Sequence, residues 1–189
     1  GSQIGFVNEL LDKNRGHELE NKDVRLDCSE YRLVYRKISN PTNERTVIAT
    51  VLPKGTPTLD SVYTLRPFKI DIEEEYLFQD NLHSAYNRIF SDRELFVALG
   101  LCNCLPFDFL MRTKDAQNLL AFRFEESQMP RLTDGDNWFH YISERAARLN
   151  CYGEEFAEMR ERLGDIESAT KEDERRRLQA EIDAAAFHA

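Results

Sequence analysis

Two stretches rich in β-branched and aromatic residues decide the fold: Tyr31-Arg32-Leu33-Val34-Tyr35-Arg36-Lys37-Ile38 and Arg45-Thr46-Val47-Ile48-Ala49-Thr50-Val51-Leu52. Residues of these types favour the pleated, half-buried surface of a strand. Between the two stretches lies Ser39-Asn40-Pro41-Thr42-Asn43-Glu44, a cluster of turn-forming residues. Two strand-like runs joined by a turn predict an antiparallel hairpin, with 31–38 paired to 45–52.

Shorter signals place further elements on both sides of this hairpin. Residues 6–11 have helical spacing, and residues 62–66 and 119–124 are expected to form short strands. Ser91 and Glu94 have the spacing of a capping box, so a helix is expected to begin after Ser91. It should run to about residue 104, where Pro106 would break it.

From residue 136 onward the apolar residues recur at helical spacing. Three stripes are expected to face the core: Trp138, Tyr141, Ile142, Ala146 and Leu149; Phe156, Met159 and Leu163, stopped by Gly164; and Leu178, Ile182 and Ala185. The predicted fold is therefore α+β, a twisted and mainly antiparallel sheet with packed helices, followed by a C-terminal helical subdomain. The expected units are an N-terminal helix and linker at 1–27, with Gly1-Ser2 a cloning remnant, an α+β body at 28–132 and a helical extension at 133–189.

Composition and charge narrow the function. The 189 residues are 41% apolar and 31% charged. No run approaches the roughly 18 apolar residues that a spanning helix needs, so a membrane is not an expected partner. The formal charge of -9 argues against a nucleic-acid binder, which is usually basic. Residues 1–70, however, carry 11 Lys and Arg against 9 Asp and Glu, so the first third of the chain can still present a basic face.

Signatures of catalysis are absent from the sequence. It contains neither a glycine-rich phosphate loop nor a GxSxG nucleophile motif, and no Cys has an obvious helper His. The four cysteines, Cys28, Cys102, Cys104 and Cys151, are too scattered for a disulfide framework, so a reducing cytoplasm is the expected compartment. They are interpreted as buried thiols, with a metal site as the alternative.

Four segments, taken in order, resemble one bacterial family. Residues 31–53 resemble the pattern YRLVxRxI…TxERTxIAxxLP, and residues 99–112 are similar to LLNSxxFDxLxR. Residues 118–130 resemble NLxxFxxxQLPxP, and the ending at 178–189 resembles LRAELDALVAHLYGL. The ordered set is typical of the target recognition domain in the Eco57I-like class of DNA adenine-N6 methyltransferases and fused restriction-modification enzymes. Cys104 departs from the pattern, because Ser is usual there.

The resemblance implies a sequence-specific DNA recognition module that is not catalytic by itself. In that family the methyltransferase core lies N-terminal to this region. S-adenosylmethionine is therefore expected in a parent chain, a site-specific adenine-N6 DNA-methyltransferase, and no cofactor in this one. The implied partners are double-stranded DNA and the N-terminal methyltransferase domain of that parent. In such a module Arg pairs with guanine and Asn or Gln with adenine, while other cations hold phosphates.

The candidate DNA-binding residues are Arg32, Arg36, Lys54, Thr56, Arg66, Arg112, Lys114, Gln117 and Asn118. Arg32 and Arg36 are four residues apart in a strand and so share one face, where they form either a phosphate-contacting pair or a solvated surface. The other residues border two loops. Two further classes stay open: a protein-interaction module, and a structural C-terminal module of a larger bacterial complex. Steep salt dependence of duplex binding separates DNA recognition from both.

Overall fold

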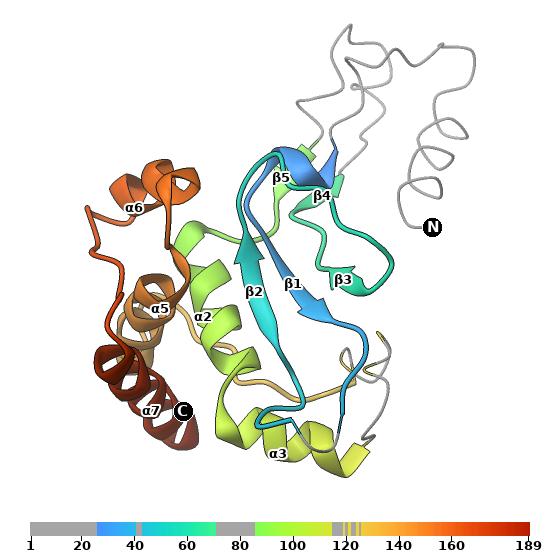
Figure 1. Cartoon of the computed structure of the whole chain (residues 1–189), viewed down its shortest axis with the longest axis vertical. Helices are drawn as coiled ribbons and strands as arrows, with labels where there is room; N and C mark the ends of the chain where they lie inside the picture. Colours follow the sequence, from blue (N-terminus) through green and yellow to red (C-terminus); the bar gives the residue numbers. More distant parts are fainter. Residues whose placement is uncertain are drawn as a thin grey trace, which may run out of the picture.

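The computed structural model describes residues 26–40, 43–70, 86–114, 119, 121, 124 and 126–189 (Figure 1). The predicted helix at 6–11 lies outside these residues. A three-stranded antiparallel sheet has the order β2-β1-β3, and β4 pairs with β5 in a separate two-stranded sheet. The strands are β1 (Arg32–Arg36), β2 (Ala49–Leu52), β3 (Val62–Thr64), β4 (Phe68–Ile70) and β5 (Tyr86–Arg88), preceded by the short 3-10 helix η2 (Asp27–Ser29). Together with the helices below, this confirms the α+β class.

The predicted hairpin is confirmed. β1 pairs with β2 in antiparallel register, with Arg32 opposite Leu52 and Tyr35 opposite Ala49. On its other side β1 pairs with β3. Because side chains alternate across a strand, Leu33 and Tyr35 share one face of β1, and both belong to the hydrophobic core.

The first long helix, α2 (Asp92–Cys102), begins as predicted. Ser91 accepts a hydrogen bond from the backbone N–H of Glu94, and the Glu94 carboxylate accepts one from the Ser91 N–H. The helix ends at Cys102, close to the predicted end at about residue 104. Pro106 follows in the first turn of the next helix, α3 (Leu105–Lys114). Proline is tolerated there because first-turn N–H groups have no partner within the helix.

Replacing Ser91 by Ala should lower the free energy of unfolding by about 1 kcal/mol. The change leaves the Glu94 N–H without its side-chain acceptor, and both residues are exposed, so water replaces part of the bond. Urea denaturation of the two proteins measures the difference. A Ser91→Asp variant, which restores an acceptor, should recover most of the loss. Equal stability of the Ala variant and the unmodified chain would contradict a stabilising cap.

The strand expected at 119–124 is wrong. Ala121 and Phe124 have helical backbone, and Leu119 has no regular structure. The Leu119 N–H does donate to the Lys37 carbonyl at 2.9 Å, next to the end of β1. The Phe124 ring stacks on Tyr35, with 4.4 Å between centroids. Such a short apolar run packs equally well as strand or helix, and its periodicity does not tell the two apart.

The C-terminal part is helical, as predicted. It contains α5 (Asn137–Asn150), the 3-10 helix η5 (Glu154–Phe156), α6 (Ala157–Arg162) and α7 (Glu172–His188). The second and third predicted stripes are buried in full, and Gly164 follows α6 with a φ of 96°. The first stripe also faces the core: Ile142 and Ala146 are buried in it, and the half-buried Trp138, Tyr141 and Leu149 pack against it. α5 buries Phe139, Ser143 and Ala147 as well.

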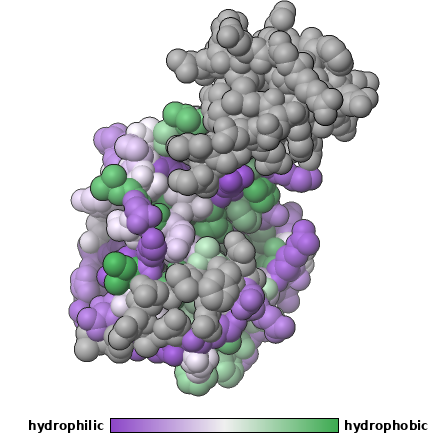
Figure 2. Space-filling view, turned by 90° about the vertical axis from the view of Figure 1, so that its right-hand side faces the viewer, coloured by the Kyte–Doolittle hydropathy of each residue, from purple (hydrophilic) through white to green (hydrophobic). Residues whose placement is uncertain are grey.

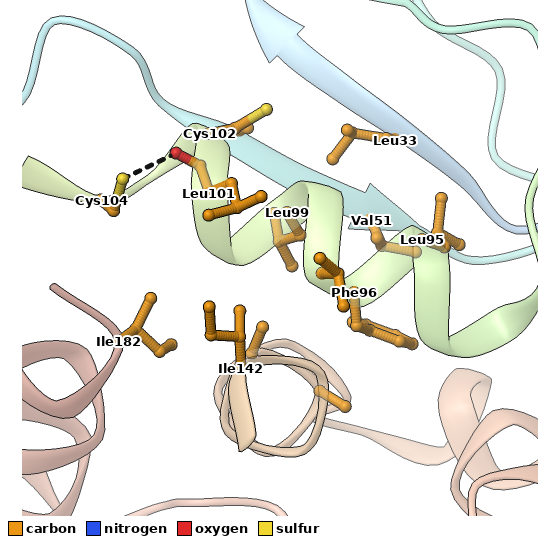
Figure 3. Close-up of a cluster of buried hydrophobic side chains, with 14 of the residues drawn as sticks. Leu33, Val51, Leu95, Phe96, Leu99, Leu101, Cys102, Cys104, Ile142 and Ile182 are labelled. Carbon is orange, nitrogen blue, oxygen red and sulfur yellow. Dashed lines mark hydrogen bonds between the residues drawn. The ribbon is translucent and has the colours of Figure 1, made fainter. Parts of the chain in front are cut away.

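Helix α2 lies at the centre of the core, between the sheet and the C-terminal helices. Leu33 and Val51 approach it from the strands, and Ile142 and Ile182 approach it from α5 and α7 (Figure 3). Gly100 permits the close approach of α5, because a Cβ there would lie 2.6 Å from the Ile142 methyl group. The described core thus continues across residue 132, and the division of the chain into a body and an extension stays a prediction.

Candidate nucleic-acid interface

The structure divides the predicted DNA ligands into two groups at opposite ends of β1. Arg32, at the start of β1, lies opposite Leu52 and donates to the Thr56 carbonyl, so Lys54 and Thr56 belong to this end. The Leu65 N–H donates to the Leu33 carbonyl, which brings Arg66 to the same end. The second group is made of Arg36, at the end of β1, with Arg112 and Lys114 of α3. Gln117 and Asn118 lie outside the described residues.

Arg32 and Arg36 were expected to share an accessible strand face, as a phosphate-contacting pair or a solvated surface. For Arg32 this expectation is wrong. Its side chain is only 1% exposed, and its guanidinium Nη2 donates to the Thr56 carbonyl. Burial lowers the pKa of the guanidinium, while the nearby Cys28 and Asp27 oppose this shift. The loop that follows β2 covers the residue, so Arg32 is not accessible to a phosphate in this conformation.

The same loop is held in place at several points, which fixes Lys54 and Thr56. The Gly55 N–H donates to the Cys28 carbonyl at 2.7 Å, and Gly55 has a φ of 79°, a conformation that glycine adopts without strain. Lys54 forms an ion pair of 2.7 Å with Glu158 and lies over the Tyr31 ring. This loop therefore joins the strands to α6, and Lys54 already has an internal counter-ion.

Arg112 holds the turn of the hairpin. Its Nη2 donates to the carbonyls of Asn43 and Glu44 at 2.9 and 2.8 Å, and its Nε donates to Asp108 at 2.7 Å. Asp108 is only 4% exposed and also accepts a hydrogen bond from the Thr46 N–H. The turn is thus fixed to α3 by one carboxylate and one guanidinium.

Arg36 lies against the same turn. In the amide orientation that satisfies its neighbours, the Asn43 side-chain oxygen accepts from Arg36 Nη2 and from the Asn40 N–H. The Nε of Arg36 is buried, with no hydrogen-bond partner in the part of the chain that the structure describes. Lys114 Nζ donates to the Glu126 carbonyl at 3.2 Å and to the Ser127 hydroxyl at 3.1 Å.

We call Arg36, Lys37, Arg45, Arg112 and Lys114 the basic end. Lys37, which sequence reasoning did not single out, forms an ion pair of 3.3 Å with the exposed Asp60. Arg45 forms one of 2.8 Å with Asp183 of α7. The sequence does contain a signal for Lys37, because this residue directly follows Arg36 and both come just before the turn. Cations from β1, the turn and α3 therefore gather at one end of a chain whose net charge is negative.

A cleft of about 740 Å³ lies elsewhere, between β2, α2, α5 and α7. Its lining includes Thr50, Asn103, Asn150 and Gln179. The amides of Asn103 and Asn150 bond to the backbone of β2 and not to the open space. Glu172, Arg175 and Arg176 also line it, and none of the predicted DNA ligands contributes to it.

All four cysteines are free thiols. Three of them, Cys102, Cys104 and Cys151, are buried, and Cys28 is half-buried. Burial raises the pKa of Cys151 to about 12, and burial likewise raises the pKa of Cys102 and of Cys104. Thiols of this kind form little of the reactive thiolate at neutral pH. No group of three or more His, Cys, Asp or Glu side chains in the described residues is placed to hold a metal ion.

Among the described helices, no single one is both long enough and apolar enough to cross a bilayer. Taken together, α2 and α3 meet the requirement by length and composition, but they are bent by 59° at their junction. The buried residues of both helices contribute to the protein core. Comparisons with protein-family models, curated protein sequences and solved structures found no match to this chain.

Proposed function

We propose that the chain is a non-catalytic DNA recognition module, and that its basic end contacts duplex DNA. The observation that carries the proposal is a hairpin turn that Asp108 and Arg112 hold in place and that Arg36 contacts. Lys37 directly follows β1, and Lys114 is the last residue of α3. Cations that neutralise phosphates supply most of the non-specific affinity for DNA. A rigid scaffold that presents a loop is the usual arrangement for recognition.

The distribution of charge supports an approach from this end. The chain carries a formal charge of -9, which opposes the approach of duplex DNA at long range. At the basic end five cations stand against the three carboxylates that pair with them, Asp60, Asp108 and Asp183. The hairpin turn at this end would face the DNA. Weak binding is the consequence, with a Kd on the order of 10⁻⁴ to 10⁻⁶ M for the chain alone. The sequence resemblance adds the context: the module would serve an adenine-N6 DNA methyltransferase or a fused restriction-modification enzyme, docked on its N-terminal catalytic domain.

The Lys37→Gln/Lys114→Gln double variant should bind duplex DNA more weakly than the unmodified chain at low salt. The slope of log K against log salt is negative, and each lost phosphate contact reduces its magnitude by about 0.9. The loss of two contacts should therefore make the slope shallower by roughly 2. Fluorescence anisotropy with a labelled duplex over a salt series measures both quantities. The matched control is Lys54→Gln/Lys171→Gln, which removes the same charge away from the basic end and should change the slope less.

Equal slopes for the two double variants would overturn the basic end as the contact surface. No measurable binding by the unmodified chain at low salt would overturn DNA recognition itself. That result would favour the second candidate function, a protein-interaction module. It is favoured by exposed apolar side chains on α3 and α7, of which Phe109 is 71% exposed. On the face shown in Figure 2, hydrophilic side chains cover most of the described surface and apolar ones gather in small, separate patches.

A further inference from the structure

The outer edge of β2 is closed by side chains and not by another strand. β2 is an edge strand of the sheet β2-β1-β3. An edge strand presents a row of unpaired N–H and C=O groups, which are a template for pairing with another chain. In β2 the residues Ala49 and Val51 direct these groups away from β1, toward α2 and α5.

Two asparagine amides occupy these positions. The Ala49 N–H donates to Asn103 Oδ1 and Asn103 Nδ2 donates back to the Ala49 carbonyl, both at 2.9 Å. The Val51 N–H donates to Asn150 Oδ1 at 2.9 Å, and Asn150 Nδ2 donates back to the Val51 carbonyl at 3.0 Å. Each amide thus takes the place of a peptide group in a neighbouring strand, at alternate residues as in a β ladder.

The two asparagines are carried by helix ends that α7 supports. Asn103 is the C-cap of α2, and Asn150 is the last residue of α5. Gln179 of α7 donates to the Asn103 carbonyl at 3.3 Å, and Arg175 donates to the Leu149 carbonyl at 2.9 Å. The amides are therefore held in place beside the cleft that flanks the edge.

The sequence of the strand shows what these amides exclude. β2 and the three residues before it, Thr46-Val47-Ile48-Ala49-Thr50-Val51-Leu52, are uncharged and mostly β-branched, and they include neither Pro nor Gly. Segments of this kind pair readily with copies of themselves. A β2 edge that meets the same edge of a second molecule in antiparallel order closes a two-fold dimer. We infer that the outer edge of β2 is a latent strand-pairing surface for a second copy of this chain, kept closed by Asn103 and Asn150.

The test is the mass of the Asn103→Ala/Asn150→Ala variant, measured by light scattering over a concentration series. The variant should show about a doubling of mass, or larger species, at concentrations where the unmodified chain does not. Ser91→Ala is the matched control, since it removes a hydrogen bond at the other end of α2 and leaves the β2 edge closed. Adding Thr50→Lys to the double variant places a charge on the edge and should restore the mass of the unmodified chain.

Two results would overturn the inference. One is a folded double variant whose mass equals that of the unmodified chain at every concentration. The other is association that persists after Thr50→Lys, which would place the contact elsewhere. If the double variant does not fold, Asn150→Asp decides, because it keeps an acceptor for the Val51 N–H and removes the donor to the Val51 carbonyl. Raised mass supports the inference, and unchanged mass contradicts it. DNA binding plays no part in this test.

Discussion

An Asp108→Ala variant is expected to lose about 2–3 kcal/mol of the free energy of unfolding. The carboxylate is 4% exposed and accepts from both the Thr46 N–H and Arg112 Nε. Its removal leaves the Thr46 N–H buried without an acceptor, since Thr46 is itself 2% exposed. The ion pair with Arg112 adds less, because 36% of that side chain is exposed and solvent screens the charge.

Urea denaturation measures this loss, and Asp108→Asn is the matched control. The amide keeps an oxygen for the Thr46 N–H but carries no charge for Arg112, so it should retain more than half of the stability that the Ala variant loses. A loss below about 0.5 kcal/mol in the Ala variant, which is the range of surface substitutions, would contradict the role of Asp108 as the anchor of the turn.

Replacing Phe96 by Ala should destabilise the protein by about 3–5 kcal/mol. Phe96 is fully buried on α2, where the sheet and the C-terminal helices meet (Figure 3). Truncation to Ala removes the apolar surface that the ring buries and leaves a cavity in a closely packed core. Thermal or urea unfolding measures the effect, and it is the largest expected of any single change considered.

Phe109→Ala is the matched control for Phe96→Ala, because it makes the same chemical change on α3 at a side chain that is 71% exposed. It should alter stability by no more than about 0.5 kcal/mol. Similar losses in the two variants would mean that α2 does not lie at the centre of the core.

The elements that sequence reasoning predicted are those with strong local signals. The hairpin follows from β-branched runs on either side of a turn, and α2 follows from the capping box at Ser91 and Glu94. The stripe of Phe156, Met159 and Leu163 is buried as its spacing indicates. The strand expected at 119–124 is wrong for the opposite reason, because an apolar run this short is compatible with a strand or a helix and tertiary packing chooses between them.

The site was less predictable, because contacts between distant residues determine it. Arginine is rarely buried, so nothing in the sequence indicated that Arg32 would be covered by the Thr56 loop. Arg112 was expected to contact DNA, yet its Nε and Nη2 donate to Asp108 and to the hairpin turn. Only its spacing of four residues from Asp108 on one helix hinted at this pairing. Arg112 variants therefore test the scaffold of the turn as much as its contact with DNA.

The most direct test of the proposed function is to map amide chemical shifts of the ¹⁵N-labelled chain during a titration with duplex DNA at low salt. The account predicts the largest changes at the basic end, in β1 near Arg36, in the hairpin turn and at Arg112 and Lys114 of α3. It predicts small changes in α6 and α7, apart from the neighbourhood of Asp183, which pairs with Arg45. Changes confined to the cleft beside β2, or to α6 and α7, would contradict DNA recognition by the basic end.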